Sequence, residues 1–542
     1  MSKQTKRRQF LKLGTSACAL AITGPALRAS AETTRAAYQA KPFEFEEAAV
    51  NDLQNAMQQG RHTARSIAES YLARIDELDK HGPAINSVIE LNPDALEIAE
   101  ALDRERKAKG ARGPLHGIPV LIKDNIDTAD KMMTTAGSLA LVGSKPPRDA
   151  FVVERLRAAG AVILGKTNLS EWANFRSTHS TSGWSGRGGL TRNPYALDRN
   201  TSGSSSGSGA ATAANFTAIA VGTETDGSIV SPSTTCGLVG IKPTLGLVSR
   251  AGIIPIAHSQ DTAGPMARTV TDATILLGAL VGIDARDAAT AESRGKAQAD
   301  YTKFLDAGGL KGARIGVLRK SFGFNDRVDK LMQEAIDVMK RAGAEVIDPA
   351  DIPTHGKFDD SEFEVLLYEF KADLNAYLAT LGPQAPVHSL KEIIAFNEKN
   401  ADKEMPYFGQ EIMLKAEAKG PLTDAAYRKA LEKDLRMSRK EGIDAVIVKH
   451  KLDALIAPTG GPAWKTDLPN GDHFTGGLST APAVAGYPHI TVPAGFVYGL
   501  PVGISFTGLA WTEPTLIKLA FAYEQATKHR RPPKFLANVE TV

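Results

Sequence analysis

From about residue 116 onward, short apolar runs alternate with segments of helical periodicity, and this alternation restricts the fold more than any other feature of the sequence. Residues 118–122 predict a buried strand, residues 151–159 a helix closed by Gly160, and residues 161–164 the next strand. A similar strand–helix–strand unit follows at 315–347. Alternation of this kind predicts an α/β protein whose sheet is covered by helices on both faces.

The segments on either side of this alternation are predicted to be mainly helical. Residues 32–110 are interpreted as helices, with Thr63 as an N-cap before an apolar face. Residues 355–450 are again predicted to be mostly helical, whereas the polar stretch 285–312 predicts a segment that runs over the surface. Late strands are predicted at 454–456, 489–492 and 502–506.

The first 31 residues are typical of an export signal rather than of a folded segment. A basic head containing Arg7 and Arg8 precedes an apolar run, which ends in the cleavage-type signal Ala29-Ser30-Ala31. The arginine pair resembles a twin-arginine signal, which engages export machinery and directs folded bacterial proteins to the periplasm or outside the cell. The alternative is a membrane-anchoring helix, but the run falls short of the roughly 20 apolar residues that a span needs. We therefore expect cleavage after residue 31 and no membrane association afterwards.

Removal of this segment changes what the charge and cysteine counts indicate. Residues 1–31 contain six Lys or Arg and no acidic residue, so the formal net charge of +3 less six becomes −3 for residues 32–542. The basic balance of the whole chain therefore does not indicate a nucleic-acid partner. Cys236 is the one cysteine left after residue 31, which excludes an internal disulfide there. Cys18 as a lipid-anchor cysteine is a weaker alternative to simple cleavage.

Two familiar motifs match the sequence but lack the context that their chemistry requires. Residues 160–167 fit the phosphate-loop pattern, yet their middle residues predict a buried strand and a helix precedes them. Residues 203–207 fit the G-x-S-x-G elbow of hydrolases without the apolar strand that should precede it. The 11 histidines show no tight ligand spacing, so neither a metal nor a nucleotide is expected.

Three other segments contain residues suited to amide hydrolysis. An apolar strand ends in Lys123, a Ser/Gly tract occupies 201–209, and Gly222-Thr-Glu-Thr-Asp-Gly-Ser228 begins at the end of the run 219–222. Together with Asp261-Thr-Ala-Gly-Pro-Met-Ala-Arg268, these segments resemble the amidase signature family, and the resemblance extends over roughly 45–510. It implies the amidase signature fold, with a large mixed central β-sheet, in a single domain over 32–542. That domain would comprise a helical part at about 40–110, a catalytic core at about 116–280 and a helical substrate-side region at about 355–450.

The resemblance also implies a serine hydrolase that uses a Ser–cis-Ser–Lys triad and no cofactor. Matching the family motifs to this chain gives Ser228 as the nucleophile, Ser204 as the relay after a cis peptide bond, and Lys123 as the base. Three consecutive serines leave the relay assignment open by one residue. The oxyanion hole would consist of four consecutive backbone N–H groups, those of Thr225, Asp226, Gly227 and Ser228.

The proposed base must be neutral before it can accept a proton. A serine hydroxyl is a weak nucleophile until a base takes its proton, and a lysine at its ordinary pKa of roughly 10.4 is charged. Lowering that pKa to roughly 7–8 requires about 4 kcal/mol, which desolvation at the end of a buried strand can supply. The sequence thus predicts a buried Lys123 among small residues.

Two departures from the family pattern bear on the substrate. Asp226 replaces a glycine, which places a carboxylate near the site, and Val230 stands where many members have arginine. The motifs look most like those of bacterial peptide amidases, which remove the C-terminal amide of peptides. Aryl or aliphatic amides, and a non-catalytic member that only binds amides, are the alternatives. The glutamyl-tRNA amidotransferase subunit shares this fold, but the export signal argues against a tRNA partner.

Overall fold

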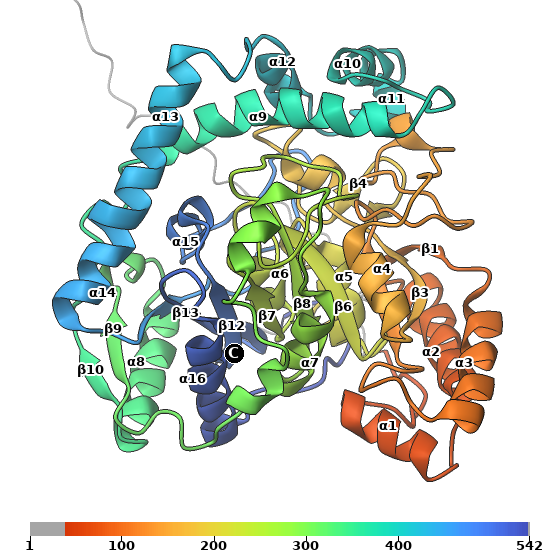
Figure 1. Cartoon of the computed structure of the whole chain (residues 1–542), viewed down its shortest axis with the longest axis horizontal. Helices are drawn as coiled ribbons and strands as arrows, with labels where there is room; N and C mark the ends of the chain where they lie inside the picture. The colour runs from red at the N-terminus through yellow and green to blue at the C-terminus, as the bar shows by residue number, and fades with distance from the viewer. Residues whose placement is uncertain (1–37, 540–542) are drawn as a thin grey trace, which may run out of the picture. The chain divides into compact units, whose positions relative to one another are not determined.

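The computed structural model describes residues 38–539, which are organised around an eleven-stranded sheet (Figure 1). The strand order is β1-β3-β2-β6-β8-β7-β12-β13-β11-β9-β10. The strands of this sheet are β1 (Val88–Leu91), β2 (Pro119–Lys123), β3 (Val162–Thr167), β6 (Ile219–Glu224), β7 (Val239–Lys242), β8 (Thr262–Ala267), β9 (Arg314–Val317), β10 (Glu345–Ile347), β11 (Ala454–Pro458), β12 (His489–Val497) and β13 (Leu500–Thr507). A separate two-stranded sheet consists of β4 (Trp184–Ser185) and β5 (Gly189–Leu190).

The sheet is mixed, and its parallel part brings two of the site segments together. Strand β2 pairs in parallel with both β3 and β6, whereas β8 pairs antiparallel with β6 and β7. Because the carboxyl ends of parallel strands meet at one edge of a sheet, the end of β2 lies beside the end of β6. Lys123 and Thr223 are therefore neighbours in space although they are far apart in sequence.

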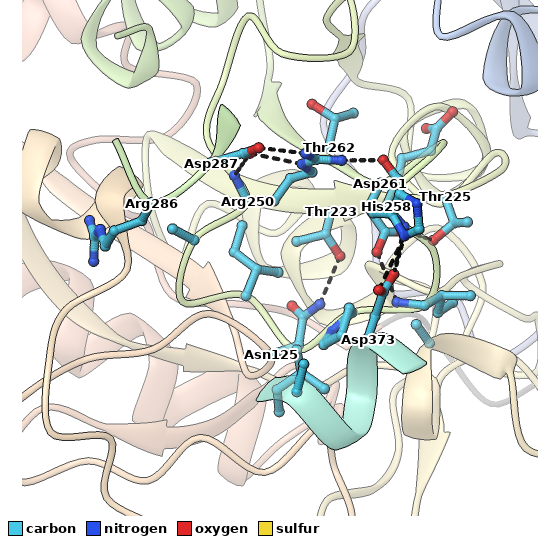
Figure 2. Close-up of a pocket in the computed structure, with 18 residues that line it drawn as sticks. Asn125, Thr223, Thr225, Arg250, His258, Asp261, Thr262, Arg286, Asp287 and Asp373 are labelled. Carbon is cyan, nitrogen blue, oxygen red and sulfur yellow. Dashed lines mark hydrogen bonds and ion pairs between the residues drawn. The ribbon is translucent and has the colours of Figure 1, made fainter. Parts of the chain in front are cut away.

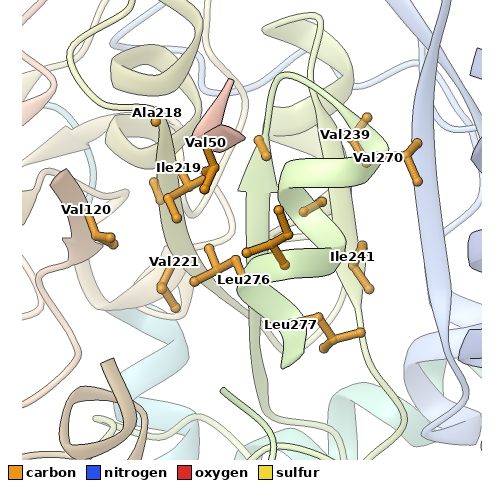
Figure 3. Close-up of a cluster of buried hydrophobic side chains, with 14 of the residues drawn as sticks. Val50, Val120, Ala218, Ile219, Val221, Val239, Ile241, Val270, Leu276 and Leu277 are labelled. Atoms are coloured by element: carbon orange, nitrogen blue, oxygen red, sulfur yellow. The ribbon is translucent and has the colours of Figure 1, made fainter. Parts of the chain in front are cut away.

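Helices cover both faces of the sheet, as the alternation of strands and helices predicts. The helices are α1 (Val50–Gln58), α2 (Ala64–Ile75), α3 (Ala95–Lys109), α4 (Phe151–Ala158), α5 (Ser206–Ala213), α6 (Val230–Thr235), α7 (Val270–Leu280), α8 (Asp326–Arg341), α9 (Asp359–Thr380), α10 (Leu390–Lys399), α11 (Ala401–Glu404), α12 (Glu411–Glu417), α13 (Ala425–Leu435), α14 (Asp444–His450), α15 (Thr480–Ala485) and α16 (Glu513–Thr527). On one face, Leu276 and Leu277 of α7 pack against Ile219 and Val221 of β6 (Figure 3). These four side chains are fully buried and belong to the main hydrophobic core.

The opposite face of the sheet is covered by α5 and α6, whose side chains are small. Gly222 of β6 and Gly240 of β7 point toward these helices. A Cβ atom at Gly222 would lie 2.9 Å from the hydroxyl oxygen of Ser205, and one at Gly240 would collide with Ser233. The Ser/Gly tract is therefore a close-packed part of the fold rather than a linker, because only small residues let the helix approach the strands this closely.

Most predicted elements are present, but β1, β7 and β8 of the large sheet and the short strands β4 and β5 were not predicted. Thr63 caps α2, since its side chain accepts a hydrogen bond from the Ser66 N–H at 3.0 Å. The prediction of an all-helical segment over 32–110 is wrong at β1, which lies inside that segment and pairs with β3. Strands β7 and β8 were also missed. The predicted boundary at residue 31 lies outside the described residues and stays a prediction.

A helical region, α9 to α14, lies over one edge of the sheet, with the 22-residue α9 running across the top of Figure 1. Phe370 and Leu374 of α9 are buried in a second apolar cluster, which includes residues of α10 and α12. This observation confirms the helical prediction for 355–450. Among residues 38–539, no helix combines the length and the hydropathy that a membrane crossing would require.

Candidate active site

Lys123, the last residue of β2, is completely buried beside the Ser/Gly tract. Its Nζ atom donates hydrogen bonds to Ser204 Oγ at 2.8 Å and to Thr223 Oγ1 at 2.9 Å. Burial lowers the pKa of this lysine to about 7, since removing the ammonium from water disfavours its charged form. The side chain is therefore poised to exchange a proton near neutral pH, as the sequence predicts.

The structure distinguishes Ser204 from the two serines that follow it. The hydroxyl of Ser205 donates to the Thr223 carbonyl at 3.0 Å, and that of Ser206 donates to the Ser202 carbonyl at 2.7 Å. Both hydroxyls thus hold backbone, whereas Ser204 Oγ receives the lysine hydrogen bond. The peptide bond between Gly203 and Ser204 is cis. The structure accordingly places Ser204, and neither of its neighbours, against Lys123.

Ser228 lies in the turn after β6, on the same side of the sheet as the Ser/Gly tract. It is 8% exposed, and its carbonyl oxygen accepts a hydrogen bond from the Ser205 N–H at 3.2 Å. Within residues 38–539, the Ser228 hydroxyl forms no hydrogen bond with Ser204. The structure therefore brings the three predicted residues into one site, with Lys123 and Ser204 in direct contact and Ser228 adjoining through the backbone.

The turn from Thr225 to Ser228 carries the four predicted oxyanion donors. In the part of the chain that the structure describes, none of these four backbone N–H groups has a hydrogen-bond acceptor. Gly227 has φ +78°, and a Cβ atom there would lie 3.2 Å from the Ser479 hydroxyl, so this position requires glycine. The turn therefore presents a row of N–H groups that could bind a developing negative charge.

Asp226 does not extend freely from this turn. Its Oδ2 atom accepts a hydrogen bond from the Thr480 hydroxyl at 2.7 Å, and burial raises the pKa of its carboxyl group. The carboxylate is thus directed at α15. The sequence could not predict this partner, because Thr480 is distant in the chain and belongs to a helix of six residues.

A cavity of about 290 Å³ adjoins the buried lysine (Figure 2). It is lined on one side by Asn125, Thr223 and Thr225, and Asn125 Nδ2 donates to the same Thr223 hydroxyl that binds Lys123. On the other side it is lined by Asp373 and Ala376 of α9. The predicted helical substrate-side region therefore does contribute to the wall of a cavity next to the site.

The cavity wall also contains polar residues to which the sequence analysis assigned no role. Asp261 accepts a hydrogen bond from Thr225, and Arg250 pairs with Asp287 (Figure 2). His258 lies between two carboxylates of α9, with Nδ1 2.8 Å from Asp373 Oδ2 and Nε2 3.4 Å from Glu369 Oε1. Of these residues, Asp261 could have been noticed, because it begins one of the segments that carry the family resemblance.

The phosphate-loop match has a structural explanation. Residues 162–167 form the buried strand β3, and Lys166 Nζ donates to the Ile126 carbonyl at 2.6 Å and to Thr134 Oγ1 at 2.9 Å. The lysine is completely buried, and burial lowers its pKa. Residues 162–167 thus form the buried strand that the sequence predicts, and this strand lacks the loop that a phosphate site of this pattern requires.

The fold and the site together define a class of enzyme, and comparison with known proteins establishes the family. The family model Amidase matches residues 66–517. The chain therefore belongs to the amidase family, and it is an enzyme that hydrolyses amide bonds. This result confirms the resemblance found in the sequence, and it confirms the mixed α/β fold that the resemblance implies.

Individual relatives match almost the whole chain. A probable amidase of Arabidopsis thaliana is 46% identical over 504 residues, which cover 91% of this chain and 93% of the relative. The crystal structure of the native peptide amidase from Stenotrophomonas maltophilia is 52% identical, with a TM-score of 0.87 over 91% of this chain and 100% of that one. An amidase family protein from Bacillus anthracis is 40% identical, with a TM-score of 0.81 over 90% of this chain and 92% of that one.

Proposed function

We propose that this amidase works through a Ser–cis-Ser–Lys triad in which Ser228 attacks the amide carbon, Ser204 relays the proton and Lys123 accepts it. One observation carries the proposal: the buried Lys123 Nζ donates to Ser204 Oγ at 2.8 Å while burial holds its pKa at about 7. A neutral lysine in this position can take the Ser204 proton as Ser204 takes that of Ser228.

The first step forms an acyl-enzyme. Attack by Ser228 Oγ on the carbonyl carbon produces an oxyanion, which the N–H groups of residues 225–228 would stabilise because they have no other acceptor among the described residues. Collapse of this intermediate breaks the C–N bond, and the proton returns from Lys123 through Ser204 to the departing nitrogen. Water then attacks the Ser228 ester by the same proton route and releases the acid.

The relay needs contact between the two serine hydroxyls. The residue after Ser204 is already joined to Ser228, by the hydrogen bond from the Ser205 N–H to the Ser228 carbonyl at 3.2 Å. Catalytic hydrogen bonds are often absent or long before substrate binds, and rotation of one short side chain is enough to change them. We therefore infer that the Ser228–Ser204 hydrogen bond forms when the substrate is bound.

We propose the C-terminal amide of peptides as the substrate class. The main support is 52% identity, over all of its chain, to a protein described as a peptide amidase. The products of this reaction would be a peptide with a free carboxylate and ammonia. Aryl and aliphatic amides are the alternative substrates, and they use the same triad.

Ammonia release from a C-terminally amidated peptide tests the proposal. The protein without residues 1–31 should release ammonia, and Ser228→Ala and Ser204→Ala should lose nearly all activity. Ser205→Ala should lose far less, because in the described part of the chain the Ser205 hydroxyl binds only backbone. No release from the wild-type protein would reject the peptide-amide substrate. Equal activity of Ser228→Ala and wild type would reject the triad.

A fluorophosphonate probe separates catalysis from amide binding alone. Covalent labelling of Ser228 is expected in the folded wild-type protein, because the probe reacts with an activated serine whatever the natural acyl group is. Folded protein that binds a peptide amide but remains unlabelled would favour a non-catalytic member. Labelled protein that releases no ammonia from peptides would direct the search to aryl and aliphatic amides.

A further inference from the structure

The turn that carries the four oxyanion donors is held by a carboxylate at each end. At its exit, Glu224 Oε2 accepts hydrogen bonds from the N–H groups of Ile229 at 2.7 Å and Val230 at 3.0 Å. At its entry, Asp261 Oδ1 accepts a hydrogen bond from the Thr225 hydroxyl at 2.5 Å. The N–H groups between these two attachments bind no protein acceptor among residues 38–539, so their direction depends on how the ends of the turn are fixed.

The position of Asp261 follows from the register of the sheet. Strand β8 begins at the next residue and pairs antiparallel with β6, so that Thr262 lies opposite Glu224. Asp261 is thereby placed across from Thr225, and both residues line the cavity beside Lys123 (Figure 2). Its second oxygen, Oδ2, accepts hydrogen bonds from the N–H groups of Ile256 at 2.8 Å and Ala257 at 2.9 Å. The carboxylate is therefore itself held rigidly, as a support for another group should be.

Asp261 also acts on the proposed base through space. Its charge raises the pKa of Lys123, against the larger lowering by burial. Burial raises the pKa of Asp261 itself to about 6, so the group is mainly ionised at neutral pH. When Ser228 attacks, Lys123 becomes charged, and a nearby negative charge stabilises that state.

We propose that Asp261 is a positioning residue for this reaction: through the Thr225 hydroxyl it fixes the direction of the oxyanion turn, and its charge stabilises protonated Lys123. The inference rests on the proposed function, because it assigns a support to the same triad and turn. Asp261 contacts none of the reacting atoms in this scheme. Its effect passes through Thr225 and through the electrostatic field at Lys123.

The threonine provides the first test. Thr225→Val keeps the shape of the side chain and removes the hydroxyl, whereas Thr225→Ser keeps the hydroxyl. We expect Thr225→Val to lower kcat roughly 10- to 100-fold with little change in KM, since a small displacement of the catalytic donors costs rate rather than ground-state binding. Thr225→Ser should recover most of that loss. Thr217→Val, which removes another buried hydroxyl that holds backbone at the start of β6, measures the general cost of such a deletion.

A peptide aldehyde distinguishes positioning of the turn from a merely structural effect. The aldehyde forms a tetrahedral adduct with a catalytic serine, so its oxyanion needs the same donors as the reaction. Thr225→Val should therefore weaken aldehyde inhibition by about the same factor as it lowers kcat, while inhibition by the peptide acid product stays within a few-fold of wild type. An equal loss for both inhibitors, or a rise in KM at unchanged kcat, would overturn the inference.

The charge of Asp261 has a separate readout. In Asp261→Asn the negative charge is gone, so the pKa of Lys123 should fall and the acidic limb of the kcat/KM profile should move to lower pH. Thr225→Val should leave that limb in place. An acidic limb unmoved in folded Asp261→Asn would overturn the electrostatic part, and unchanged kcat in Thr225→Val would overturn the positioning part. If Ser228→Ala is still inactive in either case, the proposed function stands and only this inference fails.

Discussion

In the proposed mechanism, the pH range in which the enzyme works depends on one buried residue, Lys123. Its pKa of about 7 means that the ammonium form predominates below that pH and cannot accept a proton from Ser204. We therefore expect kcat/KM to rise through an acidic limb centred near pH 7 and to level off above it. The measurement is a pH–rate profile for ammonia release, with the folded state checked by circular dichroism at each pH.

Substitution of Lys123 tests whether its titration causes the acidic limb of the kcat/KM profile. Lys123→Arg should be almost inactive at every pH, because a guanidinium stays protonated throughout the accessible range. The buried Lys166 offers a matched comparison, since among residues 38–539 its Nζ binds only the Ile126 carbonyl and Thr134. An acidic limb far from pH 7, or substantial activity in Lys123→Arg, would contradict the role given to Lys123.

At the scale of elements, α9 is attached to the catalytic core by polar side chains as well as by apolar packing. Tyr377 of α9 donates a hydrogen bond to Asp127 Oδ1 at 2.8 Å. Nearby, Asp373 accepts hydrogen bonds from both the N–H and the Nδ1 of His258. The His258–Asp373 contact lies at the cavity wall, so the attachment of α9 and the shape of the cavity are linked.

The histidine contact predicts a pH-dependent attachment of α9. The hydrogen bond with Asp373 raises the pKa of His258 above its ordinary 6.5. Glu369 acts in the same direction, whereas burial and Arg250 oppose the shift. A raised pKa means that protonation of His258 favours the attached position of α9. The contribution of this contact to the stability of the attachment is fully present below about pH 6.5, and it is lost as the pH rises through the raised pKa of His258. Backbone amides of α9 should exchange faster at pH 9 than at pH 6, after correction for intrinsic exchange rates.

The control for this prediction is Asp373→Asn, which removes the charge facing the imidazole and should abolish most of the pH dependence. Exchange in α7, which packs on the opposite side of the sheet from α5 and α6, should show no such dependence. If α9 exchanges equally at both pH values, His258 does not attach this helix through its charge.

The elements also show why part of the structure could be predicted from the sequence and part could not. Strand β2 is an uninterrupted apolar run before Lys123, and such a run indicates a buried strand by itself. Strand β8 contains Gly264 and Pro265, which disfavour strands, and β1 contains Glu90. These two strands exist because partner strands were available, β6 and β7 for β8 and β3 for β1.

In the site, too, local sequence predicts some features, while others depend on tertiary contacts. Lys123, Ser204 and Ser228 were assigned from local motifs, and the structure places all three in one site. The contact between Thr225 and Asp261 depends on the register between two strands, which no local pattern specifies. The contact of Asp226 with Thr480 depends on where α15 packs. Motifs thus predict which groups react, while tertiary structure determines which groups surround them.

At the scale of the whole molecule, the fold requires that nearly the entire chain be synthesised before the sheet can be completed. Strand β12 pairs with β7, and β11 pairs with both β9 and β13, so segments from distant parts of the sequence meet in the middle of the sheet. Long-range pairing of this kind is slow, because the chain loses the entropy of closing a long loop before the stabilising contacts form. Cys236 is buried and free, so within residues 38–539 the fold depends on no disulfide and can form in a reducing compartment.

Slow long-range strand pairing and a fold that depends on no disulfide both favour a route on which folding precedes export. We propose that residues 1–31 direct this amidase along the twin-arginine route. The protein with its native first 31 residues should appear in the periplasm or medium of a bacterial host, beginning at or near Glu32. Replacing both Arg7 and Arg8 by lysine keeps the charge of the segment, so general electrostatic attraction to the membrane surface is unchanged. If recognition depends on the arginine pair, this double variant should remain in the cytoplasm as active, uncleaved enzyme. Equal export of the two proteins would show that another route, which does not read the arginine pair, carries the chain.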